Sequence, residues 1–429
     1  MKMLDLKAIL SSLENCPCGR EHKVALRHVE IGHGVALRCG AILKGLDFPQ
    51  NLLVVTDSHA LAAAPQVMDS LVEAGFVLKR LVYDTMTYAK IEQVREVEAL
   101  LDDVDGVLAL GTGSVNDICR VASFNKGKQF CIFGTAPSMD GFASDSAPIV
   151  ENNFKNSWYV EQPSVILADT AVLAKAPAEL KAAGFGDMMA KYIGILDWRI
   201  SELLTGEYYC PAIADLTMQG VAKIVAEAER LQTDDENAVA SVMEGLILSG
   251  VAMKLANSSR PASGAEHVVS HYWECYKLAR GIWPEFHGKK VGVATVLINR
   301  IYHNLADRVT DIDAIPDPTD WDEVRAAFDK SQLADLEKVN TPSITDKVAP
   351  ARLKECWPQI RAMIKEMLPD DATMMRLMRA AGAVTDPADV HVDDVLLEKG
   401  LRYHAYMRYR VLLTRLLPMM QLDIMDFVK

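Results

Sequence analysis

The chain has 429 residues, of which 50% are hydrophobic and 24% are charged, and its formal net charge is −13. This length exceeds the usual size of one hydrophobic core, so we expect a globular protein with two domains. The negative charge argues against a nucleic-acid-binding protein, because nothing offsets the repulsion by nucleic-acid phosphates. A small anionic substrate remains compatible with this charge, since a metal ion and a few local cations can hold a phosphate.

The N-terminal segment lacks the pattern of a signal peptide, because Asp5 and Lys7 interrupt any apolar core. We therefore expect a cytoplasmic protein, in which the 8 scattered cysteines need not form disulfides. Cys16, Cys18 and His22 are a possible site for a soft metal ion, but a fourth ligand is not evident. The alternative is a loop that contains free thiols.

The first third of the chain alternates short apolar runs with helical patterns. Strands are predicted at residues 51–56, 76–84, 106–110, 130–133 and 165–167, and helices at about 60–74, 91–101 and 115–123. This alternation predicts an α/β domain with a parallel sheet and helices on both faces. Ligands of such sheets bind beyond the carboxyl ends of the strands.

Long helical patterns replace this alternation after about residue 177. They cover residues 188–203, 212–230, 238–256, 291–305 and a Met-rich tail over 353–420. The stretch 238–256 is apolar, but Glu244 and Lys254 lie within it, so we expect a buried helix and no membrane span. The sequence therefore predicts an α/β domain over residues 1–170 and an all-helical domain over 171–429.

Two polar loops follow predicted strands. The first one is Gly111-Thr112-Gly113-Ser114-Val115-Asn116-Asp117, which leads into a helix. Its small residues let the backbone approach a pyrophosphate, and the helix amides point at it; the alternative is a tight turn that needs glycine for geometry alone. The second loop spans residues 134–144, and its glycines, proline and hydroxyls suit either a ligand-facing loop or an ordinary connection.

Asp57 ends the first predicted strand. A carboxylate there can accept hydrogen bonds from ribose hydroxyls, which would favour NAD by repelling a 2′-phosphate. The alternative is an aspartate that caps a turn or a helix.

Asp187, His267, His271 and His287 are candidate metal ligands in the helical part. His267 and His271 are four residues apart and share one face of a helix, which suits one ion. Each histidine could instead be a hydrogen-bonded packing residue. Asp187 could be a first-turn acid that pairs with Lys191.

Six segments together resemble a known family. They are GTGSVNDI, TAPSMDGFAS, PSVILAD, GFGDMMAKY, SRPASGAEHVVSHYWE and FHGKKVGVAT, and they occur in this order in sn-glycerol-1-phosphate dehydrogenases. The resemblance covers roughly residues 16–300 and is nearest to the bacterial, AraM-like branch. It implies a Rossmann-like domain followed by an all-α domain, as in the iron-containing alcohol dehydrogenase and dehydroquinate synthase-like superfamily.

The resemblance also implies roles for these residues. Residues 113–117 would hold the pyrophosphate of NAD or NADP, which Thr135, Ser138 and Ser144 would also contact. Asp187, His267 and His287 would ligate one divalent ion, most simply zinc, with nickel or iron as alternatives. His271 would contact the substrate, as would Asp140 and Asp187, so the resemblance does not pair His271 with His267 on the ion. Asp187, His267, His287 and His271 are the expected catalytic residues. The family resemblance also implies a homodimer.

The implied reaction interconverts dihydroxyacetone phosphate and sn-glycerol 1-phosphate, a phosphorylated polyol, by hydride transfer at C2. Lys289, Lys290 and Arg260 are candidates to hold the phosphate, although adjacent lysines are more often a solvated patch. A dehydroquinate synthase-like cyclase and a glycerol dehydrogenase are alternatives within the superfamily. A non-catalytic nucleotide-binding protein is an alternative of another class.

Overall fold

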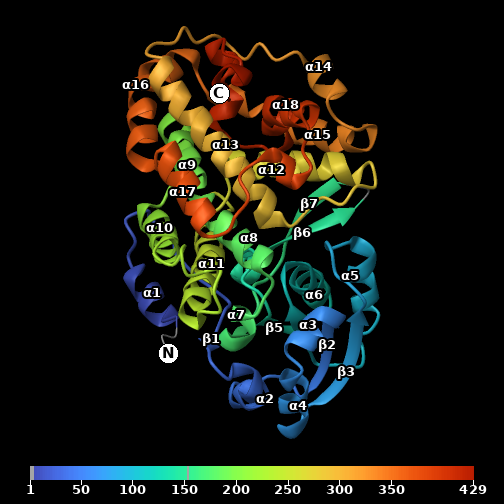
Figure 1. Cartoon of the computed structure of the whole chain (residues 1–429). Coiled ribbons are helices and arrows are strands. Elements are labelled where there is room, and N and C mark those ends of the chain that lie inside the picture. The colour runs from blue at the N-terminus through green and yellow to red at the C-terminus, as the bar shows by residue number, and fades with distance from the viewer. Residues whose placement is uncertain (1–3, 152–153) are drawn as a thin grey trace.

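The computed structural model describes residues 4–151 and 154–429, which form an α/β half and a helical half (Figure 1). The α/β half contains a six-stranded parallel sheet in the order β1-β8-β5-β4-β2-β3. Its strands are β1 (His28–Gly32), β2 (Asn51–Asp57), β3 (Val77–Tyr83), β4 (Gly106–Gly111), β5 (Gln129–Gly134) and β8 (Val165–Asp169). The predicted parallel sheet is confirmed, with β1 as a strand that the sequence analysis missed.

The central strands are apolar along their whole length because helices cover both faces of the sheet. Every residue of β4 and β8 is buried, which matches the continuous apolar runs that buried parallel strands show. The edge strand β3 is largely exposed and carries Lys79 and Arg80. The five predicted strands correspond to β2, β3, β4, β5 and β8.

Helices α2 (Val35–Gly45), α3 (Ser58–Ala63), α4 (Gln66–Glu73), α5 (Ile91–Glu98) and α6 (Gly113–Asn125) surround this sheet. The prediction of one helix over 60–74 is wrong, because Pro65 separates α3 from α4. Proline has no N–H and disfavours helical backbone in the residue before it. An antiparallel hairpin of β6 (Ser146–Glu151) and β7 (Phe154–Tyr159) was also not predicted.

The helical half begins directly after β8 with α7 (Thr170–Ala174). Its main helices are α8 (Ala178–Met189), α9 (Lys191–Thr205), α10 (Pro211–Val225), α11 (Glu236–Ala256), α12 (Ala265–Leu278), α13 (His287–Arg308), α16 (Pro350–Met367), α17 (Asp371–Ala380) and α18 (Asp394–Tyr403). The predicted helix over 188–203 is divided at Ala190, because its two parts pack on different neighbours. Gly186 of α8 lies against α13, whereas Gly194 of α9 lies against Ser263.

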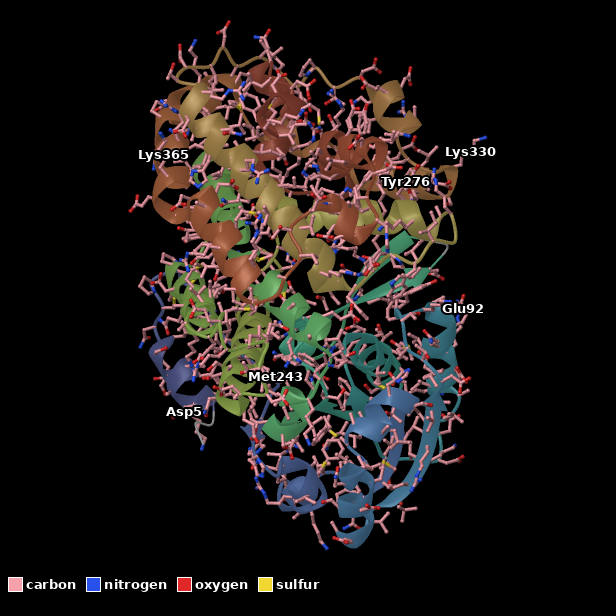
Figure 2. The ribbon with its side chains drawn as sticks, in the orientation of Figure 1. Asp5, Glu92, Met243, Tyr276, Lys330 and Lys365 are labelled. Atoms are coloured by element: carbon pink, nitrogen blue, oxygen red, sulfur yellow. The ribbon has the colours of Figure 1, made fainter. Side chains whose placement is uncertain are left out.

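Helix α11 packs in the interior of the molecule. By length and composition alone it could cross a membrane, but 78% of its most apolar window is buried in the fold. Met243 of α11 is fully buried and packs against the end of β5 at Gly134. Figure 2 shows Met243 inside, whereas Glu92 and Lys365 lie at the surface. The prediction of a buried helix is therefore confirmed.

Residues 4–24, before β1, lie against the helical half. Helix α1 (Leu6–Ser12) runs beside α10 and α11 in Figure 1. The Cys16 Sγ atom is 3.5 Å from the Cys210 Sγ atom at the start of α10. The His22 Nδ1 atom is 2.9 Å from the backbone oxygen of Leu255 in α11. Cys16 and His22 therefore contact residues that come more than 180 positions later in the chain.

Helices α8 and α13 pack with their backbones in close approach. A Cβ atom on Gly288 would lie 2.1 Å from the backbone oxygen of Ala183, and one on Gly186 would lie 2.9 Å from the backbone oxygen of Gly288. Only glycine fits such contacts. The two helices are thereby held at a short, fixed separation beside the candidate site.

Candidate active site

A cleft of about 540 Å³ lies between the two halves, beyond the carboxyl ends of β4 and β5. Its walls come from the loops after these strands, the β6–β7 hairpin, α12, the start of α13 and residues 408–410. This is the position where parallel α/β sheets bind ligands. The cleft therefore brings both predicted loops and the predicted histidines to one cavity.

The loop after β4 presents the N-terminus of α6 to the cleft. Residues 112–114 and Asp117 line the cleft, whereas Gly111, Val115 and Asn116 lie behind them. The first amides of a helix have no carbonyl partner within that helix, so they are available to an anion. The geometry of this loop suits a phosphate group.

Asp117 is a buried carboxyl group at this loop. Burial raises its pKa to about 7, although the charge of Arg120 opposes the shift. A carboxyl group that keeps its proton near neutral pH repels a neighbouring anion less than a carboxylate does. Asp117 can therefore lie beside a pyrophosphate at modest electrostatic cost.

Arg120 of α6 holds the loop after β5 in place, a role that the sequence analysis missed. Its guanidinium is fully buried and donates to the backbone oxygens of Gly141 (2.6 Å) and Phe142 (3.0 Å). It also donates to the Ser144 hydroxyl at 2.9 Å, which in turn donates to the backbone oxygen of Ser146 at 2.8 Å. The Ser144 side chain thus already has partners at the cleft wall.

The other predicted cofactor residues occupy different positions around the cleft. Ser138 lines it, whereas Thr135 is buried behind it. Asp57 is not part of its lining, and the Asp57 Oδ1 atom accepts the backbone amide of Ala60 at 2.9 Å, which caps α3. Asp57 therefore caps a helix, which is the alternative that the sequence analysis gave for it. The Oδ2 atom of Asp57 remains available to other partners.

Asp187, His267 and His287 converge from α8, α12 and α13. Their ligand atoms all lie within 4.8 Å of one another, and the distance from Asp187 Oδ1 to His267 Nε2 is 3.3 Å. His271 is outside this group, one turn along α12, with its ring centroid 5.8 Å from that of His287. The structure thus gathers the three residues named by the family resemblance, and the His267–His271 pair suggested by spacing does not form the group.

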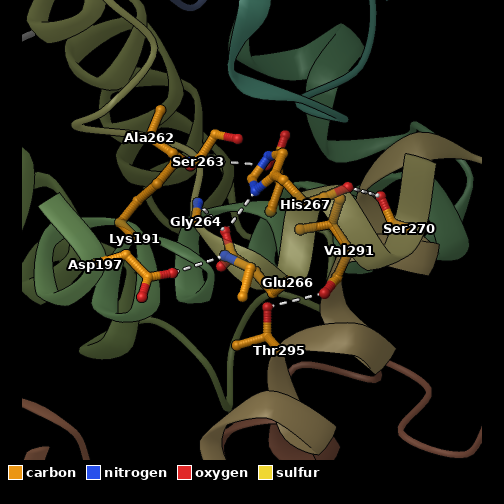
Figure 3. Close-up of polar contacts among 12 residues, drawn as sticks. Lys191, Asp197, Ala262, Ser263, Gly264, Glu266, His267, Ser270, Val291 and Thr295 are labelled. Atoms are coloured by element: carbon orange, nitrogen blue, oxygen red, sulfur yellow. Dashed lines mark hydrogen bonds and ion pairs between the residues drawn. The ribbon is translucent and has the colours of Figure 1, made fainter. Parts of the chain in front are cut away.

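Glu266 orients His267, although no sequence pattern distinguished this glutamate from a surface residue. It is fully buried, and its Oε1 atom lies 2.6 Å from the His267 Nδ1 atom (Figure 3). The Gly264 amide donates to the same Oε1 atom at 2.9 Å. With Nδ1 bonded to a carboxylate, the Nε2 atom of His267 faces Asp187, as in metal-ligating histidines.

Lys191 joins Asp187 to Asp140 at the base of the site. Its Nζ atom lies 2.6 Å from Asp140 Oδ2 and 3.1 Å from Asp187 Oδ1. The Asp140 amide donates to Asp187 Oδ2 at 3.0 Å. Burial alone would lower the pKa of Lys191, but the two carboxylates outweigh it and raise that pKa. The predicted Asp187–Lys191 pair therefore exists together with the metal-ligand cluster.

His271 and His287 are neutral at the cleft. Burial lowers the pKa of His287 to about 3, and burial with the nearby charges of Arg408 and Lys155 holds the pKa of His271 well below its usual range. The Nδ1 atom of each ring has no hydrogen-bond partner among the described residues. Each imidazole therefore keeps a lone pair for a ligand or a proton.

The cationic end of the cleft differs from the one that we predicted. Lys290 lines the cleft, but Lys289 and Arg260 do not. Lys289 pairs with Glu285 at 3.0 Å, and Arg260 donates to Glu207 at 2.9 Å. The cations that line the cleft are Lys155, Lys290, Arg408 and Arg410. Lys155 and the arginines were missed because nothing in the sequence links β7 or the C-terminal tail to α12.

Comparisons with known proteins agree with this architecture. Residues 30–177 match the iron-containing alcohol dehydrogenase family. The chain is 31% identical to "Glycerol-1-phosphate dehydrogenase [NAD(P)+]" of Geobacillus stearothermophilus over 404 residues, which cover 92% of this chain and 93% of that protein. It is 32% identical to the protein of the same name from Methanosarcina barkeri, over 71% of this chain and 80% of that protein.

Solved structures share the fold at low sequence identity. A probable glycerol dehydrogenase from Sinorhizobium meliloti superposes with a TM-score of 0.61 at 16% identity, over 93% of this chain and 96% of that chain. An NADH-dependent butanol dehydrogenase from Thermotoga maritima gives a TM-score of 0.61 at 14% identity, over 95% and 96% of the two chains. At these identities the likeness bears on the fold alone.

Proposed function

The chain belongs to the glycerol-1-phosphate dehydrogenase family, and we propose that it interconverts dihydroxyacetone phosphate and sn-glycerol 1-phosphate by NAD(P)-linked hydride transfer. The observation that carries this proposal is the convergence of Asp187, His267 and His287 at a cleft that is also lined by the N-terminus of α6 and by a cluster of cations. A non-catalytic nucleotide binder of the same fold would not need this combination. A cyclase of the same fold would also bind NAD and a metal ion, and the similarity to glycerol-1-phosphate dehydrogenases favours the dehydrogenase over it.

The three converging residues are proposed to hold one divalent metal ion. An aspartate and two histidines leave coordination positions open, as a catalytic ion requires. The buried Nδ1 atom of His287 has no partner in the described chain, which fits a ring whose polar atoms await a ligand. When bound, the ion would supply Lewis-acid polarisation of the substrate C2 oxygen. Zinc fits this set best, and nickel or iron also fits it.

The protein's own groups orient the reactants and control protons around C2. Glu266 fixes the ring of His267, and Lys191 balances the charges of Asp140 and Asp187. His271 is neutral and unpaired at Nδ1, so it is our candidate to exchange a proton with the C2 oxygen. Asp140 is held by Lys191 and Ser249 beside the cluster and is the candidate to contact a substrate hydroxyl.

The substrate phosphate is proposed to bind at Arg408, with Lys155 and Lys290 beside it. Lys155 lies 3.0 Å from the Glu274 carboxylate and Lys290 lies 3.4 Å from it, so both lysines are partly neutralised. Arg408 has no carboxylate within 4.0 Å in the described part of the chain. A planar guanidinium with no anionic partner suits a phosphate well.

The cofactor is proposed to lie across the loops after β4 and β5, as NAD(P) supplies or accepts the hydride. Residues 113–117 would bind its pyrophosphate, with Thr135, Ser138, Ser144 and Asp57 around it. This gives cofactor binding to residues 1–170 and metal and substrate binding mainly to residues 171–429, with Asp140 and Lys155 as substrate contacts from the first part. Residues 4–24 pack on the helical half.

We further propose a homodimer that works in the cytoplasm. The 8 cysteines in the chain are all free thiols in the structure, and a reducing compartment keeps thiols in that state.

The decisive experiment uses chelated protein with metal added back, NADH and dihydroxyacetone phosphate, followed by chiral analysis of the product. We expect metal-dependent oxidation of NADH and formation of sn-glycerol 1-phosphate. Formation of the 3-phosphate enantiomer, or equal turnover of unphosphorylated dihydroxyacetone, would overturn the proposal. With glycerol 1-phosphate and NAD the enzyme accumulates NADH, which distinguishes it from a cyclase that regenerates its cofactor.

A further inference from the structure

A second group of potential metal-binding side chains lies outside the lining of the cleft, where the N-terminal segment meets the helical half. Cys16, Cys18 and His22 come from the loop after α1, and Cys210 comes from the residue that precedes α10. Each offers one ligand atom, and these four atoms all lie within 4.8 Å of one another. The fourth ligand, which is absent from the local sequence, is therefore supplied by the fold.

We propose that Cys16, Cys18, His22 and Cys210 bind a structural zinc ion that fastens the N-terminal segment to the helical half. Three thiolates and one imidazole are a common ligand set for zinc, and four protein ligands close the coordination sphere. Soft sulfur donors also favour zinc over magnesium or calcium. A closed site of this kind has no position for a substrate.

The distances within the group fit ligands arranged around an ion. The Cys16 and Cys210 sulfur atoms are 3.5 Å apart, and Cys18 Sγ is 3.2 Å from His22 Nε2. Ligands at about 2.3 Å from a tetrahedral zinc lie about 3.8 Å from each other. A disulfide requires sulfur atoms at about 2.05 Å, which is much closer than the observed pair.

The histidine is oriented as a metal ligand. Its Nδ1 atom is 2.9 Å from the backbone oxygen of Leu255, so Nδ1–H donates to that oxygen and Nε2 keeps its lone pair. The Nε2 atom faces the Cys18 sulfur. A hydrogen bond from the second ring nitrogen to a backbone carbonyl is the usual way in which a zinc-binding histidine is fixed.

The surroundings also suit thiolates. Cys16 and Cys210 are buried, and the Tyr208 hydroxyl donates to Cys18 Sγ at 3.5 Å. The Tyr208 ring in turn carries the Arg20 guanidinium 3.5 Å from its centroid, so a positive charge lies near the sulfur cluster. Zinc binding would convert up to three thiols into thiolates and release up to three protons to solvent.

The test distinguishes the proposed structural zinc ion from the metal ion proposed in the cleft by first removing a ligand of the cleft ion. An Asp187→Asn variant is expected to retain about one zinc per chain after dialysis, and a variant that also carries Cys210→Ala is expected to retain none. The matched control adds Cys39→Ala instead, since Cys39 and Cys210 are both fully buried. This control is expected to keep the zinc, and the readout is metal content by mass spectrometry of the intact full chain.

Cobalt provides a spectroscopic readout that does not depend on activity. The Asp187→Asn chain loaded with Co²⁺ is expected to show a sulfur-to-cobalt charge-transfer band, which the Cys18→Ser substitution weakens and the Cys210→Ala substitution weakens further. Absence of this band in the Asp187→Asn chain, or zinc retention after Cys210→Ala, would overturn the proposal. So would a Cys16–Cys210 disulfide in the protein purified under reducing conditions.

Discussion

The two groups of metal-binding side chains differ in ligand number and in what they face. His267 and His287 line the cleft with Asp187 buried beside them, so this group offers three ligands next to a cavity. The N-terminal group offers four ligands, none of which lines the cleft. Three ligands with an open side suit catalysis, and four ligands suit a structural role. On the two proposals made above, one chain would use two coordination patterns for two different tasks.

The two groups also differ in how their histidines are oriented. The ring of His267 bonds to the Glu266 carboxylate, whereas the ring of His22 bonds to the backbone oxygen of Leu255. A carboxylate raises the basicity of the ring more than a carbonyl does, and it adds charge beside the ion. We therefore expect the Glu266 carboxylate to tune a catalytic ion in the cleft, and the Leu255 carbonyl only to orient a histidine that holds a structural ion.

The largest expected effect comes from Asp187→Asn, which removes the one anionic ligand of the cleft group. We expect activity to fall about 10³-fold or more, because losing a few kcal/mol of transition-state stabilisation has this effect on the rate. Steady-state kinetics with added metal would measure it. The exposed Asp103→Asn variant is the control and should keep full activity.

The matching change in the N-terminal group should affect stability and not chemistry. We expect Cys210→Ala to lower the melting temperature by about 5 °C or more, since metal binding contributes directly to folding free energy. The kcat of the folded protein should stay within about twofold of wild type. Calorimetry and kinetics on one preparation would test both parts of this prediction. A loss of kcat without a loss of stability would contradict the structural role of the N-terminal group.

Glu266→Gln tests whether the carboxylate tunes the ion in the cleft. We expect metal affinity to fall by roughly 10- to 100-fold, the usual effect of losing a partner of a ligating histidine. Saturating metal should restore much of the activity, unlike in Asp187→Asn. Metal titration of activity measures this, with the exposed Glu92→Gln variant as control.

Arg408→Ala tests the cationic end of the cleft. We expect the KM for dihydroxyacetone phosphate to rise about tenfold or more, because a hydrogen bond to a charged group contributes about 1.5–3 kcal/mol. The KM for NADH should change little. The exposed Arg325→Ala variant is the control, and an unchanged KM for the phosphorylated substrate would place its phosphate elsewhere.

The smallest expected effect concerns pH and Asp117. Because the pKa of this carboxyl group is raised to about 7, it is protonated at pH 6 and mostly ionised at pH 8. Ionisation adds negative charge beside the pyrophosphate, so we expect the Kd for NADH to rise a few-fold over this range. The Asp117→Asn variant should bind NADH with a flatter pH dependence, as measured by fluorescence titration.

Local patterns in the sequence predicted the buried strands and the ligands on helices, but not the contacts that depend on distant segments. The continuous apolar runs of β4 and of β8 before Asp169 were predicted. β1 was missed because its five residues include Glu30, a buried carboxylate that pairs with Arg38 at 2.8 Å and with His28 at 3.4 Å. The charged Glu30 interrupts the apolar run that would have indicated a strand. Its ion pair with Arg38 forms only in the folded chain.

The candidate site shows the same limit. Its three converging residues were identified through motifs, because each motif is continuous in the sequence. Glu266 was missed because burial, and not residue type, gives it a role. Cys210 lies 188 positions after His22, as their residue numbers show, so no spacing rule could add it to the N-terminal group.

The glycines between α8 and α13 limit how the cleft group can respond to different ions. Gly186 directly precedes Asp187, and Gly288 directly follows His287, so each of these residues is bonded to a point where two main chains touch. The distance between the backbones of Asp187 and His287 is therefore set by main-chain sterics. An ion of another radius can be accommodated by turning a carboxylate or an imidazole, but not by moving the helices apart. Which of several similar ions occupies the site is then left to ligand chemistry and to the supply of metals in the cell.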